Sequence, residues 1–153
     1  MFAKLNFPVY NFKIIIDGAG GQSSKVFDIV RRKYVNLTPE EWVRQHLMHF
    51  LVTEKAVPKS LIGVEKKLLV NNIAKRTDLV VYSRDAKPLL IAECKAPSIK
   101  ITQEVFDQAA RYNLSLDVRY FILTNGLDIF FCTIDHEKKG YHFLPDLPLY
   151  SAL

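Results

Sequence analysis

The sequence of 153 residues has no apolar run approaching the roughly 18 residues of a membrane-spanning helix. Its first residues, MFAKLNFPVYNF, contain no long apolar stretch behind a basic start, so no secretory signal is visible. Two cysteines, Cys94 and Cys132, show no CxxC or Cys/His spacing, which disfavours a zinc site and a disulfide framework. These absences predict a protein of the reducing cytoplasm without a membrane segment.

A phosphate-binding loop is also missing from the glycine-rich stretch DGAGGQSS. Ser23 and Ser24 stand where the pattern GxxxxGK[ST] needs glycine and lysine, and no helix pattern follows. The stretch is therefore interpreted as a hairpin tip, and the chain as lacking its own nucleotide-driven motor. No internal repeat, low-complexity tract or long linker divides the sequence. We expect a single domain over residues 1–153, with a hairpin extension at 1–35 and a core at 38–145.

The composition is that of an ordinary globular domain, with 49% hydrophobic and 24% charged residues. The net charge of +5 permits a polyanionic partner without establishing one. Alternating or continuous apolar residues predict strands, and apolar stripes predict helices at 38–51 and about 102–116. The expected strands are 10–16 and 26–35, which form the hairpin, followed by 61–70, 77–83, 88–95, 119–124, 127–134 and 140–143.

The order strand, helix, strand between 88–95 and 119–124 predicts a parallel pair within a mixed sheet. The fold class is therefore α/β or α+β, with helices packed on a central β-sheet. The buried stripe of the second helix is expected to comprise Val105, Ala109, Tyr112 and Leu116.

The first predicted helix has the clearest boundary signals. Thr38 is an N-cap, Pro39 occupies the first helical position, and Glu41 completes a T-x-x-E capping box. Glu40 lies one turn before Val43 on the apolar stripe, whereas Glu41 points elsewhere.

The chemically informative stretch runs from Asp78 to Lys95. Glu93 and Lys95 are two residues apart on a strand, so both side chains share a face. A hairpin loop of four residues would pair Ser83 with Pro88 and would place Asp78 directly opposite Glu93. Two such carboxylates repel each other, and a divalent cation such as Mg²⁺ or Mn²⁺ would neutralise both. Lys95 could then orient a water molecule or stabilise charge in the transition state.

The stretch TDLVVY…PLLIAECK resembles the D-x(n)-E-x-K core of the PD-(D/E)XK nuclease superfamily. A wider string, from TPEEWVRQH through ECKAP, FDQAARYN and ILTNG, resembles the N-terminal nuclease domain of type I restriction enzyme R subunits over about residues 25–145. The resemblance implies a restriction-endonuclease-like fold and a Mg²⁺-dependent deoxyribonuclease. It implies that Asp78, Glu93, the backbone carbonyl of Cys94 and an acidic residue of the first helix bind the metal, while Lys95 assists the attacking water. Stripe geometry favours Glu40 as that acidic residue, with Glu41 as a cap.

Gln108 and Tyr112 match a Q-x-x-x-Y motif of helicase-linked members of these nucleases, and four residues of separation place them on one helix face. The resemblance implies that they orient the site or the nucleic acid. Lys75 and Arg76 immediately precede the expected Asp78 strand, so they are the candidates for phosphate contacts.

The sequence departs from the resembled families at two points. Thr77 replaces the proline of the superfamily name. The resembled R subunits carry a helicase-like translocase after this domain, and we expect this chain to be either a stand-alone relative or one that works with motors supplied elsewhere. The expected partners are therefore DNA and a separately encoded translocase or methylase/specificity subunit.

Several alternatives stay open at the level of the sequence. The chain could be a catalytically silent DNA-binding or assembly module, or it could act on RNA. Asp78, Glu93 and Lys95 could form a solvated salt-bridge face, and Glu40 could simply pair with Arg44 one turn later. Gln108 and Tyr112 could be helix surface and core, respectively.

Overall fold

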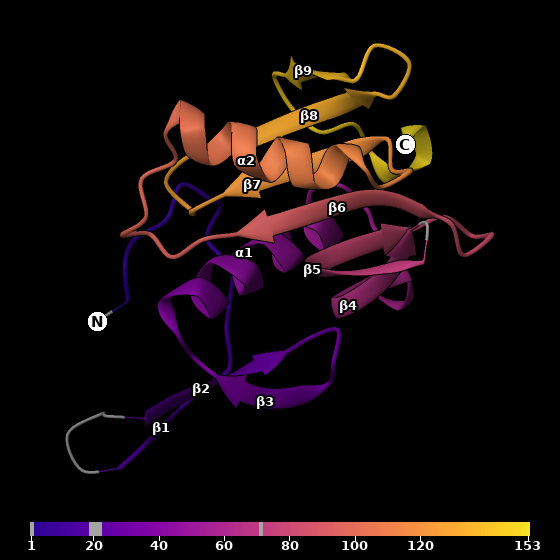
Figure 1. Ribbon diagram of the computed structural model, residues 1–153. Coiled ribbons are helices and arrows are strands. Elements are labelled where there is room, and N and C mark those ends of the chain that lie inside the picture. The colour runs from indigo at the N-terminus through magenta and orange to yellow at the C-terminus, as the bar shows by residue number, and fades with distance from the viewer. Residues whose placement is uncertain (1, 19–22, 71) are drawn as a thin grey trace.

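A computed structural model describes residues 2–18, 23–70 and 72–153. The described chain forms a three-stranded sheet, a six-stranded sheet and two α-helices (Figure 1). The small sheet consists of β1 (Ile14–Asp17), β2 (Ser23–Asp28) and β3 (Lys33–Asn36). The central sheet has the strand order β4 (Ile62–Val70), β5 (Ile73–Tyr82), β6 (Pro88–Cys94), β7 (Tyr120–Thr124), β8 (Ile129–Asp135) and β9 (Gly140–Leu144). The helices are α1 (Pro39–Thr53) and α2 (Gln103–Leu114), with short 3-10 helices at Lys59–Leu61 and Tyr150–Ala152.

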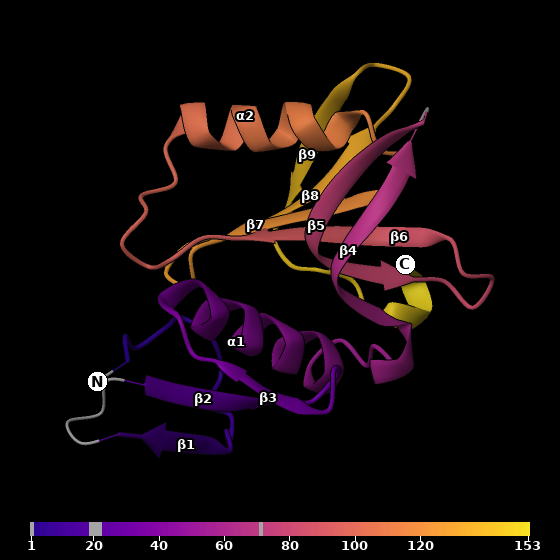
Figure 2. The ribbon, with the colours of Figure 1, turned by 60° about the horizontal axis from the view of Figure 1, so that its bottom comes forward.

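The two helices cover opposite faces of the central sheet, and the small sheet lies on the far side of α1 (Figure 2). The strands β6 and β7 are parallel and are joined through α2, whereas the other neighbouring pairs are antiparallel. The predicted mixed sheet with flanking helices is therefore confirmed. No helix in the described parts of the chain is long and apolar enough to cross a membrane.

Helix α1 begins where the sequence predicted, because the Thr38 hydroxyl accepts a 3.1 Å hydrogen bond from the Glu41 N–H. Its buried face, which includes Val43, Leu47 and Leu51, packs against the central sheet. The interpretation of Glu41 as a cap holds for its backbone alone. Its side chain turns to Arg44, at 2.8 Å, instead of closing a capping box.

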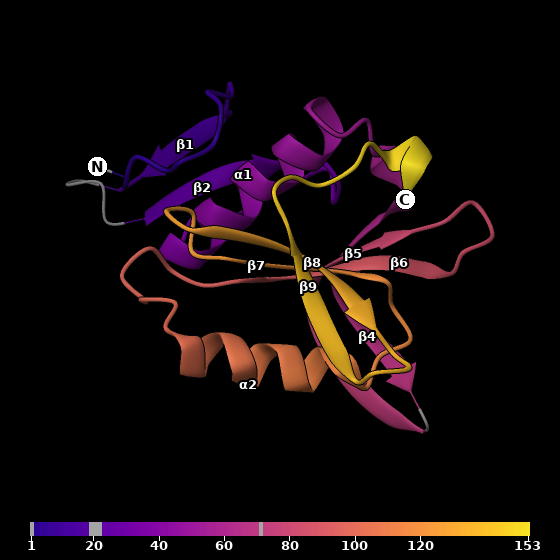
Figure 3. The same cartoon turned by 90° about the horizontal axis from the view of Figure 1, so that it is seen from above.

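The expected buried stripe of helix α2 is only partly correct, because Ala109 and Leu116 are buried and Tyr112 is not. Its buried residues are Phe106, Ala109, Ala110 and Asn113. Tyr112, which was expected in the stripe, is 42% exposed. Phe106 packs against Phe121 and Phe130 and sets the helix rotation, so Tyr112 lines a cleft together with Glu93 and Cys94 at the end of β6. Figure 3 shows α2 on the face of the sheet opposite to α1.

The hairpin between β5 and β6 reaches the expected register by an unexpected route. Tyr82, rather than Ser83, pairs with Pro88, so the predicted four-residue loop is wrong by one residue. An irregularity between Val81 and Tyr82 then leaves one extra residue on β6. The two deviations cancel, and Leu79 pairs with Ala92 as the predicted register requires.

The N-terminal region departs from the prediction in its second strand. Pairing of Ile14 with Val26 confirms a hairpin between β1 and β2. The segment 26–35 is not one strand, because the chain turns at 29–32 and returns as β3, which pairs with β2. Arg32 adopts the left-handed φ of 55° within that turn. Residues 19–22 of the glycine-rich tip lie outside the described residues.

Candidate active site

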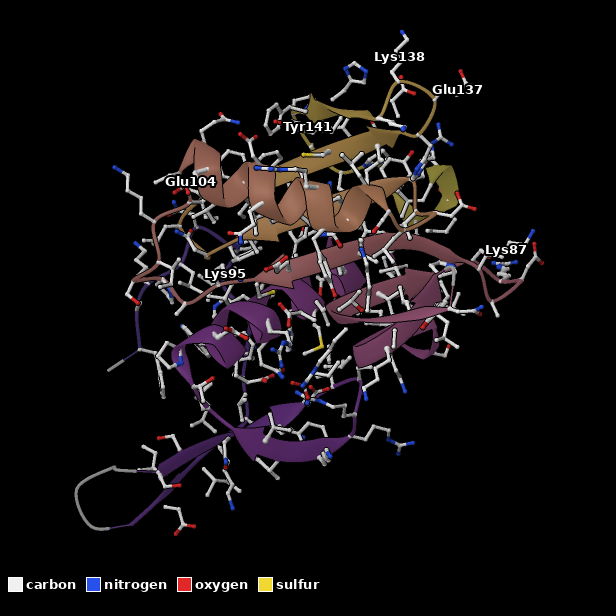
Figure 4. The ribbon with its side chains drawn as sticks, viewed as in Figure 1. Lys87, Lys95, Glu104, Glu137, Lys138 and Tyr141 are labelled. Carbon is white, nitrogen blue, oxygen red and sulfur yellow. The ribbon has the colours of Figure 1, made fainter. Side chains whose placement is uncertain are left out.

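A cleft of about 430 Å³ opens between the two helices at the C-terminal end of β6, where the pairing of β6 with β5 stops. Figure 4 shows Lys95 just beyond the arrowhead of β6, at the opposite end of this strand from Lys87 and the hairpin loop. Most of the residues that the sequence singled out line this cleft: Glu40, Arg76, Asp78, Glu93, Cys94, Lys95, Gln108 and Tyr112.

Asp78 lies at the fork where β5 leaves β6. The paired register ends at Leu79 and Ala92, so the next opposed positions along the strands are Asp78 and Glu93. The Asp78 carboxylate Oδ2 accepts a 2.7 Å hydrogen bond from the Cys94 N–H, which in a continued ladder would bond to the neighbouring strand. Because an extended residue directs its N–H and C=O to the same edge, the Cys94 carbonyl also faces this fork.

Glu93 and Lys95 form an ion pair across one position of the chain, with 2.6 Å between Glu93 Oε1 and Lys95 Nζ. Both side chains are about one third exposed, at 28% and 34%, so this pair borders solvent. The Cys94 side chain between them points into the buried cluster beneath α1, because successive side chains of a strand point to opposite faces.

Glu40 lies at the start of α1, on the face of the sheet opposite to α2, and it reaches the cleft from there. Its carboxylate lies 3.2 Å from the Arg44 guanidinium, and the same guanidinium lies 3.5 Å from Asp78. The alternative in which Glu40 pairs with Arg44 is therefore confirmed as a contact. Glu40 also lines the cleft, so the pairing and a place in the site are compatible.

The carboxylates and the lysine of the cleft have shifted pKa values. Burial is the main cause that raises the pKa of Asp78, although the Cys94 N–H and Arg44 oppose it, and Glu93 raises it further. Burial and the charge of Asp78 raise the pKa of Glu40. Burial would lower the pKa of Lys95, but hydrogen bonding and charge from Glu93 outweigh it and raise that pKa.

The donor set suits a hard divalent cation, since three carboxylates and a strand carbonyl border one cleft. Within residues 2–18, 23–70 and 72–153, however, no three His, Cys, Asp or Glu side chains already surround a single point. Each carboxylate instead faces a cation of the chain, Arg44 for Glu40 and Asp78, and Lys95 for Glu93. The residues fit a divalent cation chemically, and their present geometry is one of internal ion pairing.

The helix α2 supplies the wall opposite the carboxylates. Gln108 and Tyr112 line the cleft together, as their spacing predicted, and both are exposed. The reading of Tyr112 as a core residue is therefore wrong.

The two basic candidates occupy different environments, and both lie within β5 instead of before it. Arg76 lines the cleft, is 65% exposed at its side chain, and pairs with Glu65 at 2.8 Å. Lys75 is engaged elsewhere, because its Nζ donates to the Tyr112 carbonyl at 2.8 Å and to the Ser115 hydroxyl. It also lies 4.4 Å from the centre of the Tyr112 ring, so it fixes the end of α2.

Sequence reasoning missed a buried charge network behind the site. Arg44 is 5% exposed at its side chain and contacts Glu40, Glu41, Glu65 and Asp78. The network continues through Glu41 to Arg31, at 2.9 Å, and from Arg31 to Asp28 of the small sheet, at 2.7 Å. In the sequence, Arg31 stands in the basic run Arg31, Arg32 and Lys33, a pattern typical of a solvated surface. No local signal marks it as half-buried and paired, because the small sheet folds onto α1 through contacts that are distant in sequence.

Comparisons with known proteins agree with this architecture. A family model described as the type I restriction enzyme R protein N terminus matches residues 39–148. A solved fragment of an HsdR subunit of a type I restriction enzyme from Vibrio vulnificus YJ016 has a TM-score of 0.52 at 19% sequence identity. The alignment covers 74% of this chain and 24% of that one, so the chain spans about a quarter of the length of that structure. No curated protein matches the sequence.

Proposed function

The chain belongs to the type I restriction enzyme R protein N-terminal family, and on this premise we propose that it is a metal-dependent DNA nuclease domain that hydrolyses phosphodiester bonds. The observation that carries the proposal is the meeting of Asp78, Glu93 and Lys95 with Glu40 in one cleft. These residues come from two strands and from a helix on the other side of the sheet. A solvated salt-bridge face would not need a carboxylate that is shielded from water and hydrogen-bonded to a strand end.

Each residue has a role that follows from its position. Asp78, Glu93 and the Cys94 carbonyl would hold Mg²⁺ or Mn²⁺, with Glu40 as a further ligand, directly or through water. When bound, the ion would neutralise phosphate charge and lower the pKa of a water molecule. Lys95, which is cationic at neutral pH, would orient that water or stabilise the negative charge that develops on the phosphate.

The walls of the cleft would hold the nucleic acid. Arg76 is exposed at its rim and is suited to a phosphate oxygen. Gln108 offers an amide and Tyr112 an exposed ring, and both face the carboxylates from α2. We propose DNA as the substrate, with a translocase or methylase/specificity subunit as the source of ATP-driven movement and site selection.

The test is nicking of supercoiled plasmid in the presence of Mn²⁺ or Mg²⁺, with Asp78→Ala as the matched inactive variant. We expect conversion to the open circle by the wild type, none by the variant, and none by either in EDTA. Binding of DNA without cleavage under all of these conditions would contradict the enzyme and would favour a silent DNA-binding module of the same fold. Competition by RNA at equal concentration separates the two nucleic acids.

A further inference from the structure

Arg44 is the most heavily engaged cation of the described chain, and the proposed reaction gives it no role. Its guanidinium lies 2.8 Å from Glu41, 3.2 Å from Glu40 and 3.5 Å from Asp78. A fourth carboxylate, that of Glu65, lies 3.5 Å away. Removing a side chain of this kind from water is costly, and a single carboxylate partner would suffice to offset its charge. Two of its partners are instead carboxylates of the cleft.

The partners of Arg44 fall into two groups with different contacts. Glu41 has the shortest contact and is itself held, because it accepts hydrogen bonds from Arg31 at 2.9 Å and from Gln45 at 2.8 Å. This anchor ties the guanidinium to α1 and, through Arg31, to the small sheet. Asp78 is at the outer limit of hydrogen bonding, at 3.5 Å, and it already has the Cys94 N–H as a partner. Arg44 can therefore release Asp78 and keep its strongest partner.

We propose that Arg44 is a built-in counter-ion of the site, which neutralises Asp78 and Glu40 while no divalent ion is bound and competes with that ion for them. The proposal rests on the proposed function and adds a regulating residue to it. Arg44 is a positioning residue and not a catalytic one, because it reaches the site from behind the sheet through the carboxylates. Its effect is to keep the carboxylates of Asp78 and Glu40 ionised and in place, at the expense of affinity for the metal.

The counter-ion role and a purely structural role of Arg44 predict opposite changes in metal affinity when its charge is removed. A cation that supports the fold would destabilise the protein when removed, and would leave intrinsic metal affinity unchanged or weaken it. A competing counter-ion would also destabilise the metal-free protein, but its removal would tighten metal binding. One positive charge at several ångströms in a partly hydrated site corresponds to about a tenfold change in dissociation constant.

The experiment is isothermal titration of the full chain with Mn²⁺ at a temperature where circular dichroism shows each variant to be folded. We expect Arg44→Gln to bind Mn²⁺ about tenfold more tightly than the wild type. Arg44→Lys keeps the charge and should stay within about threefold. Lys55→Gln is the matched control, because Lys55 is a buried cation that pairs with Asp146 at 2.6 Å; it should lose stability without changing the dissociation constant.

Every outcome of the titration decides between the two proposals. Equal or weaker binding by folded Arg44→Gln would overturn the counter-ion role alone, whereas a wild type that binds no Mn²⁺ would contradict the proposed metal-dependent function itself. If Arg44→Gln does not fold, Glu65→Gln takes its place, since it removes a competing carboxylate from Arg44. The Arg44 guanidinium then interacts more strongly with Asp78 and Glu40, so Mn²⁺ binding should weaken several-fold. Unchanged or tighter binding in Glu65→Gln would overturn the role.

Discussion

The Cys94 N–H donates a 2.7 Å hydrogen bond to the Asp78 carboxylate at the point where β5 and β6 separate. A side-chain oxygen thus takes the place that a backbone carbonyl would fill in a continuous ladder. The strands β5 and β6 can therefore separate without leaving this N–H unpaired. The Cys94 carbonyl then becomes accessible from the same edge of β6. The proposed ligand set therefore depends on a strand end that Asp78 itself completes.

This hydrogen bond allows the structural role of Asp78 to be measured separately from its proposed role in metal binding. Asp78→Asn keeps an oxygen acceptor for the Cys94 N–H, so we expect it to fold with a stability near that of the wild type at acidic pH, before the wild-type carboxyl ionises. Asp78→Ala leaves a buried N–H without a partner, which costs about 1–3 kcal/mol. Both should lose Mn²⁺ binding and plasmid nicking. Urea unfolding beside the nicking assay measures both effects, and equal stability of the two variants would contradict the structural part.

The pKa shifts predict how stability changes with pH. Burial raises the pKa of Asp78 and Glu40 above the ordinary values of 3.8 and 4.5, so the folded state holds these protons more tightly than the unfolded state. Their contribution to stability is complete below the ordinary values and is lost as pH rises through the higher folded pKa. Asp78→Asn should therefore gain stability relative to the wild type as the pH rises from the ordinary value of 3.8 through the higher folded pKa. Urea unfolding of both proteins across this range measures the difference, and a constant difference would refute it.

Glu93 and Lys95 should respond to substitution in opposite ways. Glu93→Gln removes one partner of a partly exposed ion pair, so the metal-free protein should change by no more than about 1 kcal/mol. Its stabilisation by Mn²⁺ should disappear, since a ligand stabilises only the state that binds it. Lys95→Ala removes a cation beside the carboxylates, so it should keep or strengthen the Mn²⁺ shift while cleavage is lost.

A thermal-unfolding titration with Mn²⁺ on the wild type and both variants, run beside the nicking assay, checks these expectations. A full Mn²⁺ shift in Glu93→Gln would mean that the assigned ligand is wrong. Cleavage at the wild-type rate by Lys95→Ala would remove its catalytic role.

The sequence predicted the elements around the site well, because their signals are local. The T-x-x-E boundary, the apolar strand at 88–95 and the spacing of Glu93 and Lys95 each depend on a few neighbouring residues. The register of β5 with β6 was also correct at Leu79 and Ala92, although the turn was wrong. The hydrophobic faces of both strands fix that register, and the chain absorbs the difference with one extra residue near the loop.

The parts that the sequence missed depend on contacts between distant segments. The rotation of α2 follows from the packing of Phe106 against Phe121 and Phe130, and the periodicity of the helix alone did not distinguish it from the neighbouring face. Arg44 was visible as a partner of Glu40, but its burial depends on Glu65 and on the small sheet. A charged residue with four acidic partners has no local pattern, because the partners come from three separate elements.

The positions of Lys75 and Arg76 lead to a last prediction, on nucleic-acid binding. Arg76 is exposed at the cleft, whereas Lys75 is held by the Tyr112 carbonyl and the Ser115 hydroxyl at the end of α2. A phosphate contact adds about 0.9 to the slope of log affinity against log salt on duplex DNA. Arg76→Gln should therefore reduce that slope by about 1 and weaken binding equally across sequences. Lys75→Met should leave the slope unchanged and lower the stability instead, because its contacts are internal.

Fluorescence anisotropy with labelled duplex DNA in Ca²⁺ at several salt concentrations measures the slope. An equal loss of slope in both variants would mean that Lys75 leaves α2 to bind phosphate, and salt-independent binding would contradict the cleft as a path for DNA.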